Sequence, residues 1–206
     1  MTAVLAPKRT PMAGPTQPQP QPQPFRWTVE QYRDLAKTGQ FHDAKTMLID
    51  GEVYVMVMPK PPHDFALGLT DDWLRTVFAV GHHIRNQMGF VVGTANDPGP
   101  DLAVIRGTRA DYAGRTPTEA VMIVEVADSS LFFDVTTKAE LYATAGVPEY
   151  WVIDLEHREL IVFRDPQRLV IDGHAYRTKF TRKATDVASP LAAPHASVTV
   201  SDLLPP

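Results

Sequence analysis

The sequence contains no cysteine. This absence excludes disulfide bonds and every metal site that depends on thiolate ligands. It also fits a reducing compartment, so a cytoplasmic location is expected. No apolar run approaches the roughly 20 residues of a membrane-spanning helix, and no membrane association is expected. Lys8 and Arg9 follow the short N-terminal apolar patch instead of preceding it, which is the wrong order for a secretory signal.

An excess of basic charge is also missing, because the formal net charge is −4. Lys8 and Arg9 lie in the first 24 residues, which contain no acid, so 18 basic and 24 acidic residues remain for the rest of the chain. This balance argues against a protein that coats nucleic acid by bulk electrostatic attraction. An enzyme that acts on DNA stays compatible with it if the basic residues are grouped and the acids bind a metal.

Proline is unevenly distributed along the chain. Seven of the 19 prolines fall in residues 1–24, where "TQPQPQPQP" alternates proline with glutamine. Such a segment has little apolar surface to bury and is expected to be an extended, disordered arm. Residues 25–206 have ordinary globular composition and are predicted to form a single domain.

Helix and strand patterns alternate along this domain. "TVEQYRDLAKTG" predicts a helix that opens with a capping box formed by Thr28 and Gln31. "TMLIDGEVYVMV" predicts a hairpin that turns at Asp50-Gly51. After "PKPPH", the apolar residues Phe65, Leu69, Trp73 and Val77 recur every four positions and predict a second amphipathic helix.

The second half of the chain is rich in strand patterns. "HHIRNQMGFVV" looks extended, "DLAVI" follows a Pro-Gly-Pro turn, and "AVMIVEVA" is typical of a strand buried on both faces. A helix is predicted from about Asp134 to Ala145, followed by a hairpin made of "EYWVIDL" and "ELIVFRD". This order predicts an α/β (α+β) domain with one mixed central sheet flanked by helices.

Two carboxylates occupy unusual positions in these strands. Glu125 interrupts an apolar strand, and a buried carboxylate is usually paired, protonated or bound to a metal. One interpretation is a structural ion pair with an arginine such as Arg106. The other involves Asp101, which begins the preceding strand: if the two strands are neighbours, both acids can lie at one end of the sheet. Two converging oxygen ligands there would suit Mg²⁺ or Mn²⁺.

Lys138 is a third candidate. It lies four residues after Asp134 and shares a helix side with Leu141, Tyr142 and Ala145. A lysine on a partly apolar side can lay its stem along the core and bring its ammonium group to the edge of the sheet. The alternative is an ordinary solvated lysine, which is the commoner case for a helix lysine taken alone.

Several motifs occur together in a characteristic order. They are "LIDGEVYVM", "PKPPH", the glutamine of "RNQ", "PGPDLAV", "IVEVADSS", "DVTTKAELYATAGVPEYWVIDL" and "VFRDP". In this order and spacing, the chain resembles the Uma-type family of endonucleases, within the PD-(D/E)xK or restriction-endonuclease-like superfamily. The resemblance covers roughly residues 28–166 and implies a restriction-endonuclease-like fold.

The resemblance also implies roles for individual residues. Asp101 and Glu125 would be the metal-binding acids, and Lys138 would be the catalytic lysine, since Ala127 stands where the superfamily often has one. The backbone carbonyl of Val126 would bind the metal as well. The remaining implied positions are an early acid that adds to the metal shell and two polar residues that line the cleft, namely Glu52, His63 and Gln87. Gly99 replaces a second acid that family members often carry, and Asp97 lies two residues before it.

The implied activity is hydrolysis of phosphodiester bonds, most readily in DNA, with Mg²⁺ or Mn²⁺ as cofactor. Many superfamily members cut as dimers, so a homodimer is a further expectation. The alternative function is a catalytically inactive module that binds nucleic acid or protein on the same fold. A late group of basic residues could follow a phosphate backbone or could protect edge strands from aggregation; it comprises Arg164, Arg168, Arg177, Lys179, Arg182 and Lys183.

Overall fold

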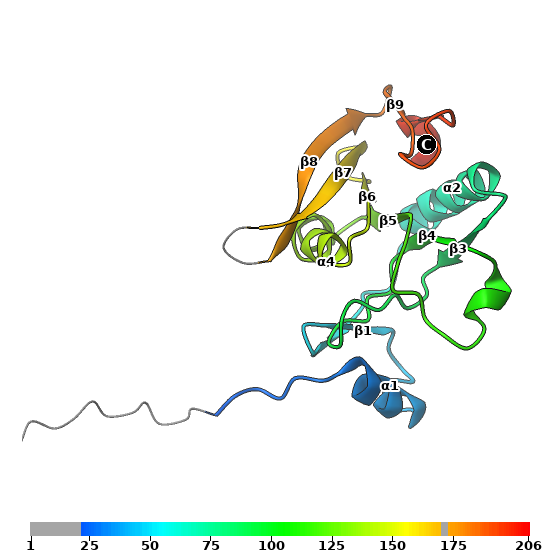
Figure 1. Ribbon diagram of the computed structural model, residues 1–206. Helices are drawn as coiled ribbons and strands as arrows, with labels where there is room; N and C mark the ends of the chain where they lie inside the picture. Colours follow the sequence, from blue (N-terminus) through cyan, green and yellow to red (C-terminus); the bar gives the residue numbers. More distant parts are fainter. Residues whose placement is uncertain (1–21, 170–172) are drawn as a thin grey trace, which may run out of the picture.

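The computed structural model describes residues 22–169 and 173–206 (Figure 1). The predicted N-terminal arm lies outside the described residues except for residues 22–24, which have no regular secondary structure. Among the described helices, none is long and apolar enough to cross a membrane.

A six-stranded sheet forms the centre of the molecule. Its strands, in spatial order, are β3 (His82–Asn86), β4 (Leu102–Arg106), β5 (Met122–Ala127), β6 (Glu149–Asp154), β7 (Glu159–Arg168) and β8 (His174–Lys183). Strands β5 and β6 are parallel and every other neighbouring pair is antiparallel. The predicted mixed central sheet is therefore confirmed, as is the hairpin formed by β6 and β7.

Helical segments cover both faces of the sheet (Figure 1). On one face lie α2 (Pro61–Val77) and a C-terminal segment that contains β9 (Val187–Ala188), β10 (Val198–Thr199) and the 3₁₀ turn η3 (Val200–Leu203). On the other face lies the connection from β5 to β6, which comprises α3 (Leu131–Phe133), the π-helical turn η2 (Asp134–Lys138) and α4 (Ala139–Thr144). Because strand side chains alternate, Val124 packs toward α2 whereas Ile123 packs toward α4.

A small second layer lies next to the α4 side of the sheet, and the chain enters it directly after residues 22–28 (Figure 1). It contains α1 (Val29–Lys37) and the hairpin of β1 (Thr46–Ile49) and β2 (Glu52–Val55). The predicted capping box of α1 is present. Asp50 and Gly51 both have positive φ, as a tight hairpin turn between twisted strands requires. The remaining short element is the 3₁₀ turn η1 (Arg109–Tyr112).

Three predicted details differ from the structure. The buried stripe of α2 is formed by Ala66, Leu67, Thr70 and Leu74, whereas Phe65 is 51% exposed. The four-residue spacing of the apolar side chains predicted a buried face that is rotated about the helix axis from the observed one. The difference arises because α2 packs against both the sheet and the C-terminal segment. The helix after β5 begins at Leu131, before the predicted Asp134.

The third difference concerns the segment after β3. The predicted extended run from His82 onward ends as a strand at Asn86, because Gln87 has φ 50 and turns the chain. The backbone N–H of Gln87 donates to the carbonyl of Asp101, so the turn is fixed by a tertiary hydrogen bond.

The late basic residues belong to β7 and β8, and β8 is an edge strand of the sheet. Arg164 points inward and forms hydrogen bonds with the buried carboxylate of Glu149 at 2.7 and 2.9 Å. Lys179 and Arg182 lie over the rings of Phe163 and Phe180. These contacts favour the structural interpretation of the group.

Candidate active site

Asp101 and Glu125 meet at the end of the sheet where β4 begins. Strands β4 and β5 pair Leu102 with Val124, and the same antiparallel register continued by one residue places Asp101 opposite Glu125. The backbone N–H of Asp101 donates to Glu125 Oε2 at 3.3 Å, and the N–H of Val126 donates to Asp101 Oδ2 at 2.9 Å. The two acids are 6% and 1% exposed. The expectation that both acids reach one end of the sheet is confirmed.

Lys138 joins this pair from the helical face. Its Nζ lies 3.0 Å from Glu125 Oε2 and 2.8 Å from Asp134 Oδ1. The side chain is 8% exposed, so the interpretation of a solvated lysine is wrong. The π turn η2 starts at Asp134 and ends at Lys138, and π turns inside helices are frequent at functional sites. Arg106, the other suggested partner of Glu125, is exposed at the end of β4.

Two further predicted residues hold the carboxylate of Asp101. His63, in the first turns of α2, places Nε2 3.2 Å from Oδ2, and Gln87 Nε2 donates to Oδ1 at 3.1 Å. The positive φ of Gln87 ends β3 at the point where its side chain reaches Asp101. Both residues line the same cavity as the acids, where sequence analysis expected them.

A cavity of about 300 Å³ opens beside this cluster. Its polar lining includes Asp101, Glu125, Lys138, His63, Gln87 and Lys45, and Val126 also borders it. The cluster is therefore accessible to a small ligand although its acids are nearly buried.

Burial and charge oppose each other at the cluster. Burial raises the pKa of Glu125 to about 8, despite the nearby ammonium of Lys138. Burial acts against the charge of Lys138 too, but the carboxylates of Glu125, Asp134 and Asp101 raise its pKa above the ordinary lysine value. Burial also disfavours the ionised form of Asp101, yet the hydrogen bond and charge of His63, with Lys138, lower its pKa overall. Lys138 is thus held in its protonated form, and Glu125 keeps its proton to a higher pH than an ordinary carboxyl group does.

Comparison with known proteins identifies the family. A family model described as "Uma2: Putative restriction endonuclease" matches residues 29–201. The chain belongs to the Uma2 family.

Solved structures show that this Uma2 chain shares its fold with a known protein. A crystal structure described as "a putative nuclease" from Anabaena variabilis aligns with a TM-score of 0.66 at 14% identity, over 85% of this chain and 96% of that one. The type IIG restriction endonuclease BpuSI aligns with a TM-score of 0.33 at 15% identity, over 50% of this chain and 11% of that one, which is too weak to support an argument. No curated protein matches the chain.

The Uma2 cluster has the donors that a hard divalent cation takes. The buried ammonium group of Lys138 contacts the buried carboxylates of Glu125 and Asp134, and the charge of the buried Asp101 acts on it as well. Among the described residues, no three or more histidine, aspartate or glutamate side chains are grouped so that they could hold a metal ion together. Mg²⁺ does not require such a group, because it commonly binds through one or two carboxylates while water and substrate phosphate complete its shell. The donor set therefore fits Mg²⁺ or Mn²⁺. A bound cation would replace hydrogen-bond donors of the protein that now contact the carboxylate oxygens of Asp101 and Glu125.

Two acids near the motif segments do not join the cluster. Glu52, predicted to add to the metal shell, is not among the cavity-lining residues; it pairs with Arg26 at 2.8 Å and accepts a hydrogen bond from Tyr54. Asp97 is buried against Arg33 at 2.7 Å and does not line the cavity either, so it does not replace the acid missing at Gly99.

Three polar residues of the site were not predicted from the sequence. Asp134 accepts from Ser130 Oγ at 2.5 Å besides its contact with Lys138, and Tyr142 donates to Glu125 Oε1 at 2.7 Å. Their spacing of four residues on either side of Lys138 was the available signal, since such positions share a helix face.

The third missed residue is Lys45, immediately before β1. Its Nζ donates to Gln87 Oε1 at 2.9 Å, and within the described parts of the chain no carboxylate lies within ion-pair distance of it. Loss of hydration lowers its pKa although its side chain is exposed along the cavity wall. Lys45 is therefore a cation at the cavity without a carboxylate partner of its own.

Proposed function

We propose that this protein is a divalent-metal-dependent endonuclease that hydrolyses phosphodiester bonds in DNA. The observation that carries the proposal is the meeting of Asp101, Glu125 and Lys138 in one cavity from three separate segments of the chain. The description of its family as restriction endonucleases supports a nuclease reaction and DNA as the substrate.

The metal would be held by the carboxylates of Asp101 and Glu125 and by the backbone carbonyl of Val126. When bound, Mg²⁺ or Mn²⁺ would polarise the phosphoryl group and lower the pKa of a coordinated water. Gln87 and His63 hold the carboxylate of Asp101 in place, and Tyr142 does so for Glu125. Such fixed orientation of ligands is what outer partners contribute to metal sites.

Lys138 balances charge within the cluster. Its ammonium lies between Glu125 and Asp134, so it reduces the repulsion that would otherwise favour protonation of the acids. In the proposed reaction it donates a hydrogen bond to the attacking water or to a phosphate oxygen while keeping its contact with Asp134.

Lys45 has a different role in the proposal. Because it lacks a carboxylate partner, its ammonium can bind a non-bridging oxygen of the scissile phosphate without first breaking an ion pair. Lys60 also lines the cavity but is paired with Asp128 at 2.8 Å, which makes it a matched control. Lys45→Met is expected to weaken DNA binding in EDTA more than Lys60→Met. Equal effects would contradict the role given to Lys45.

A plasmid-nicking assay tests the proposed function directly. Wild type, Asp101→Asn and Asp154→Asn are compared in Mg²⁺, in Mn²⁺ and in EDTA. Asp154 is a suitable control because it is also a buried aspartate but binds His157 outside the cavity. Wild type and Asp154→Asn should nick in both metals and not in EDTA. Asp101→Asn should lose about 100-fold or more, since even outer partners of metal ligands contribute about 10–100-fold.

The assay also separates the enzyme from a binding module on the same fold. DNA binding without nicking by a folded wild-type protein in either metal would favour the inactive module. Nicking that persists in Asp101→Asn would show that the reaction does not use this cluster.

A further inference from the structure

One wall of the cavity is apolar and takes no part in the chemistry described above. It is formed by the β1–β2 hairpin, by the chain leaving β2 toward α2 and by the helical segment opposite. We name it the apolar wall and define it as Met47, residues 54–59 and Phe133. Val57 and Met58 are 80% and 85% exposed.

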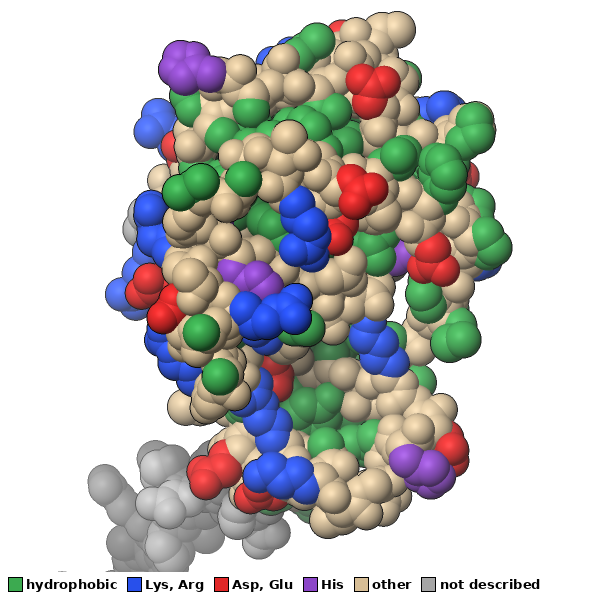
Figure 2. Space-filling model, turned by 90° about the vertical axis from the view of Figure 1, so that its right-hand side faces the viewer, with side chains coloured by type: hydrophobic (Ala, Val, Ile, Leu, Met, Phe, Trp, Pro, Cys, Tyr) green, Lys and Arg blue, Asp and Glu red, His purple; other side chains and the backbone are tan. Residues whose placement is uncertain are grey.

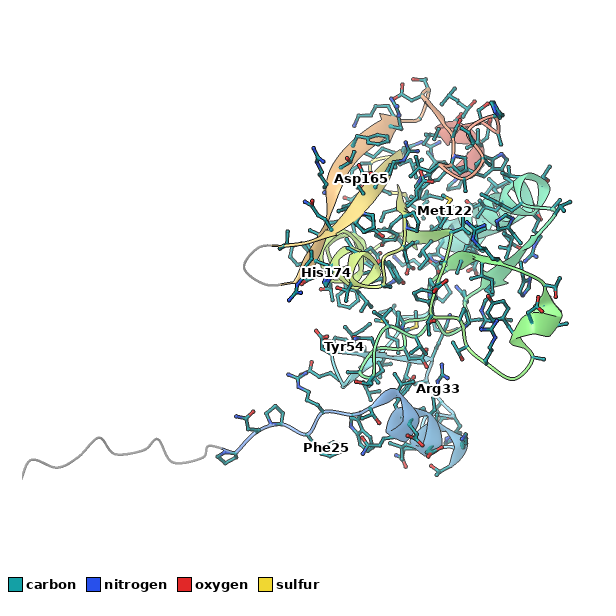
Figure 3. All side chains as sticks on the ribbon, viewed as in Figure 1. Phe25, Arg33, Tyr54, Met122, Asp165 and His174 are labelled. Atoms are coloured by element: carbon teal, nitrogen blue, oxygen red, sulfur yellow. The ribbon has the colours of Figure 1, made fainter. Side chains whose placement is uncertain are left out.

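This wall is poorly suited to a phosphate or a metal ion, which bind to charged and polar donors. Exposed apolar side chains gathered around a concave site are instead typical of a surface that binds an apolar partner. Within the wall, the rings of Tyr54 and Phe133 lie next to each other, with centroids 5.7 Å apart and planes tilted by 46°. Figure 3 shows Tyr54 on the hairpin side, below the helical segment that contains Phe133.

We propose that the apolar wall binds one nucleobase, unstacked from its neighbours, of the nucleotide next to the scissile phosphate. The inference rests on the proposed function, because that function places the phosphate at Asp101 and Glu125. It adds a substrate class: single-stranded DNA, or duplex DNA with an unpaired nucleotide. Every base offers a flat face that stacks on aromatic side chains without regard to sequence.

The size of the cavity favours a single base over a base pair. About 300 Å³ is at the lower limit of small-ligand pockets, and a base inside an intact duplex stays stacked beyond its reach. An unpaired nucleotide can turn its base into the recess while its phosphate remains at the polar wall.

The cation of Lys45 favours a nucleotide over an apolar protein segment. Lys45 lines the same cavity as the apolar wall and has no carboxylate of the described residues at ion-pair distance, whereas Lys60 and Lys138 line it while paired with acids. A ligand that is both anionic and flat-faced satisfies the two halves of the cavity together. On the face shown in Figure 2, Lys, Arg, Asp and Glu side chains are interspersed with apolar ones.

The test uses a short single-stranded oligonucleotide with one 2-aminopurine between two abasic spacers, so that its fluorescence falls through stacking on an aromatic ring of the protein and not through stacking on neighbouring bases. Binding is measured in EDTA, where no cleavage is expected, for the full-length wild type, Tyr54→Ala, Phe133→Ala and Phe132→Ala. Phe132 is the matched control because it is 80% exposed and does not line the cavity. Thermal melts verify that each variant is folded.

Wild type and Phe132→Ala should bind the oligonucleotide with quenched fluorescence. Tyr54→Ala and Phe133→Ala should bind at least about fivefold more weakly with less quenching, as expected from the loss of base stacking. In Mg²⁺, wild type should cleave the single strand at least about tenfold faster than a fully paired duplex of the same sequence.

Specific outcomes would overturn the inference. One is binding by the wild type without quenching, and another is a loss of affinity in Phe132→Ala equal to that in Tyr54→Ala. The others are equal cleavage rates for paired and unpaired substrates, and quenching that disappears as the protein self-associates through the apolar wall. Because fluorescence is read without catalysis, failure of base binding is distinguishable from failure of the proposed nuclease. Cleavage without quenching refutes only the base site, and quenching without metal-dependent cleavage refutes only the nuclease.

Discussion

Removal of the ammonium group of Lys138 tests the electrostatic balance of the cluster. Lys138→Met keeps the length and packing of the side chain but leaves the carboxylates of Glu125 and Asp134 without their shared cation. Breaking a buried ion pair in this way typically costs about 3–5 kcal/mol. At pH 7 the lower value, about 3 kcal/mol, is expected because Glu125, with a pKa near 8, is already largely protonated and Asp134 is the acid that loses its cation.

The predicted loss is large enough to measure by thermal unfolding. For a domain of this size, 1 kcal/mol corresponds to about 2–4 °C, so Lys138→Met should melt about 6–12 °C below wild type in EDTA. Lys37→Met is the control, because Lys37 forms an exposed ion pair with Asp34 that should contribute at most about 1 kcal/mol.

Added Mg²⁺ or Mn²⁺ should restore part of the stability of Lys138→Met. A cation at 100 times its dissociation constant stabilises the folded state by about 2.7 kcal/mol, and the increase should be greater in the variant than in wild type. If Lys138→Met melted like Lys37→Met, the ammonium would not be balancing buried carboxylates, and the description of the cluster would be refuted.

Three other predictions follow from individual contacts. Tyr142→Phe removes a hydrogen-bond donor to the buried Glu125 and should lower the free energy of unfolding by about 1–3 kcal/mol. Because the lost hydrogen bond favours the ionised carboxylate, the pKa of Glu125 should rise and the acidic limb of the pH–rate profile should move to higher pH. In EDTA, the free energy of unfolding should fall as pH rises from about 4.5 to about 8, because folding raises the pKa of Glu125 and the folded state holds its proton over this window. Thermal melts from pH 5 to 9 should show this decline, and Glu125→Gln should reduce it. Arg164→Met leaves the cavity residues unchanged but removes the arginine partner of the buried Glu149, so it should lower the melting temperature by about 6 °C or more. The nicking rate per folded molecule should stay unchanged. A lower rate per folded molecule would contradict the structural role of Arg164.

Local signals predicted much of the fold. The β1–β2 hairpin depends on Asp50-Gly51, whose positive φ angles are favoured by these residue types, and the α1 capping box is likewise contained within four residues. The convergence of Asp101 and Glu125 required one additional assumption, that the strands carrying them are antiparallel neighbours, which the β4–β5 pairing satisfies.

The features that sequence analysis missed depend on tertiary contacts. Gln87 adopts a positive φ that its residue type does not indicate, because its backbone and side chain both bind Asp101. Glu52 looked like a site acid, but Arg26, from the segment before α1, pairs with it. Neither partner is close in sequence, so no local pattern could have revealed these contacts.

The helical part of the site illustrates the same limit. Asp134 looked like an ordinary acid near the start of a helix, whereas the π turn that ends at Lys138 and the packing of this segment against the sheet bury both side chains. The four-residue spacing of the two residues predicted a shared face but not which face is buried.

A crystal structure of the protein soaked with Mn²⁺ tests the central claim most directly. The anomalous signal of Mn²⁺ should reveal one ion within about 2.0–2.6 Å of carboxylate oxygens from both Asp101 and Glu125, with Lys138 still in contact with Asp134. Full-occupancy Mn²⁺ bound elsewhere, with Lys138 still paired to Glu125 and no ion between the two acids, would contradict the proposed metal site.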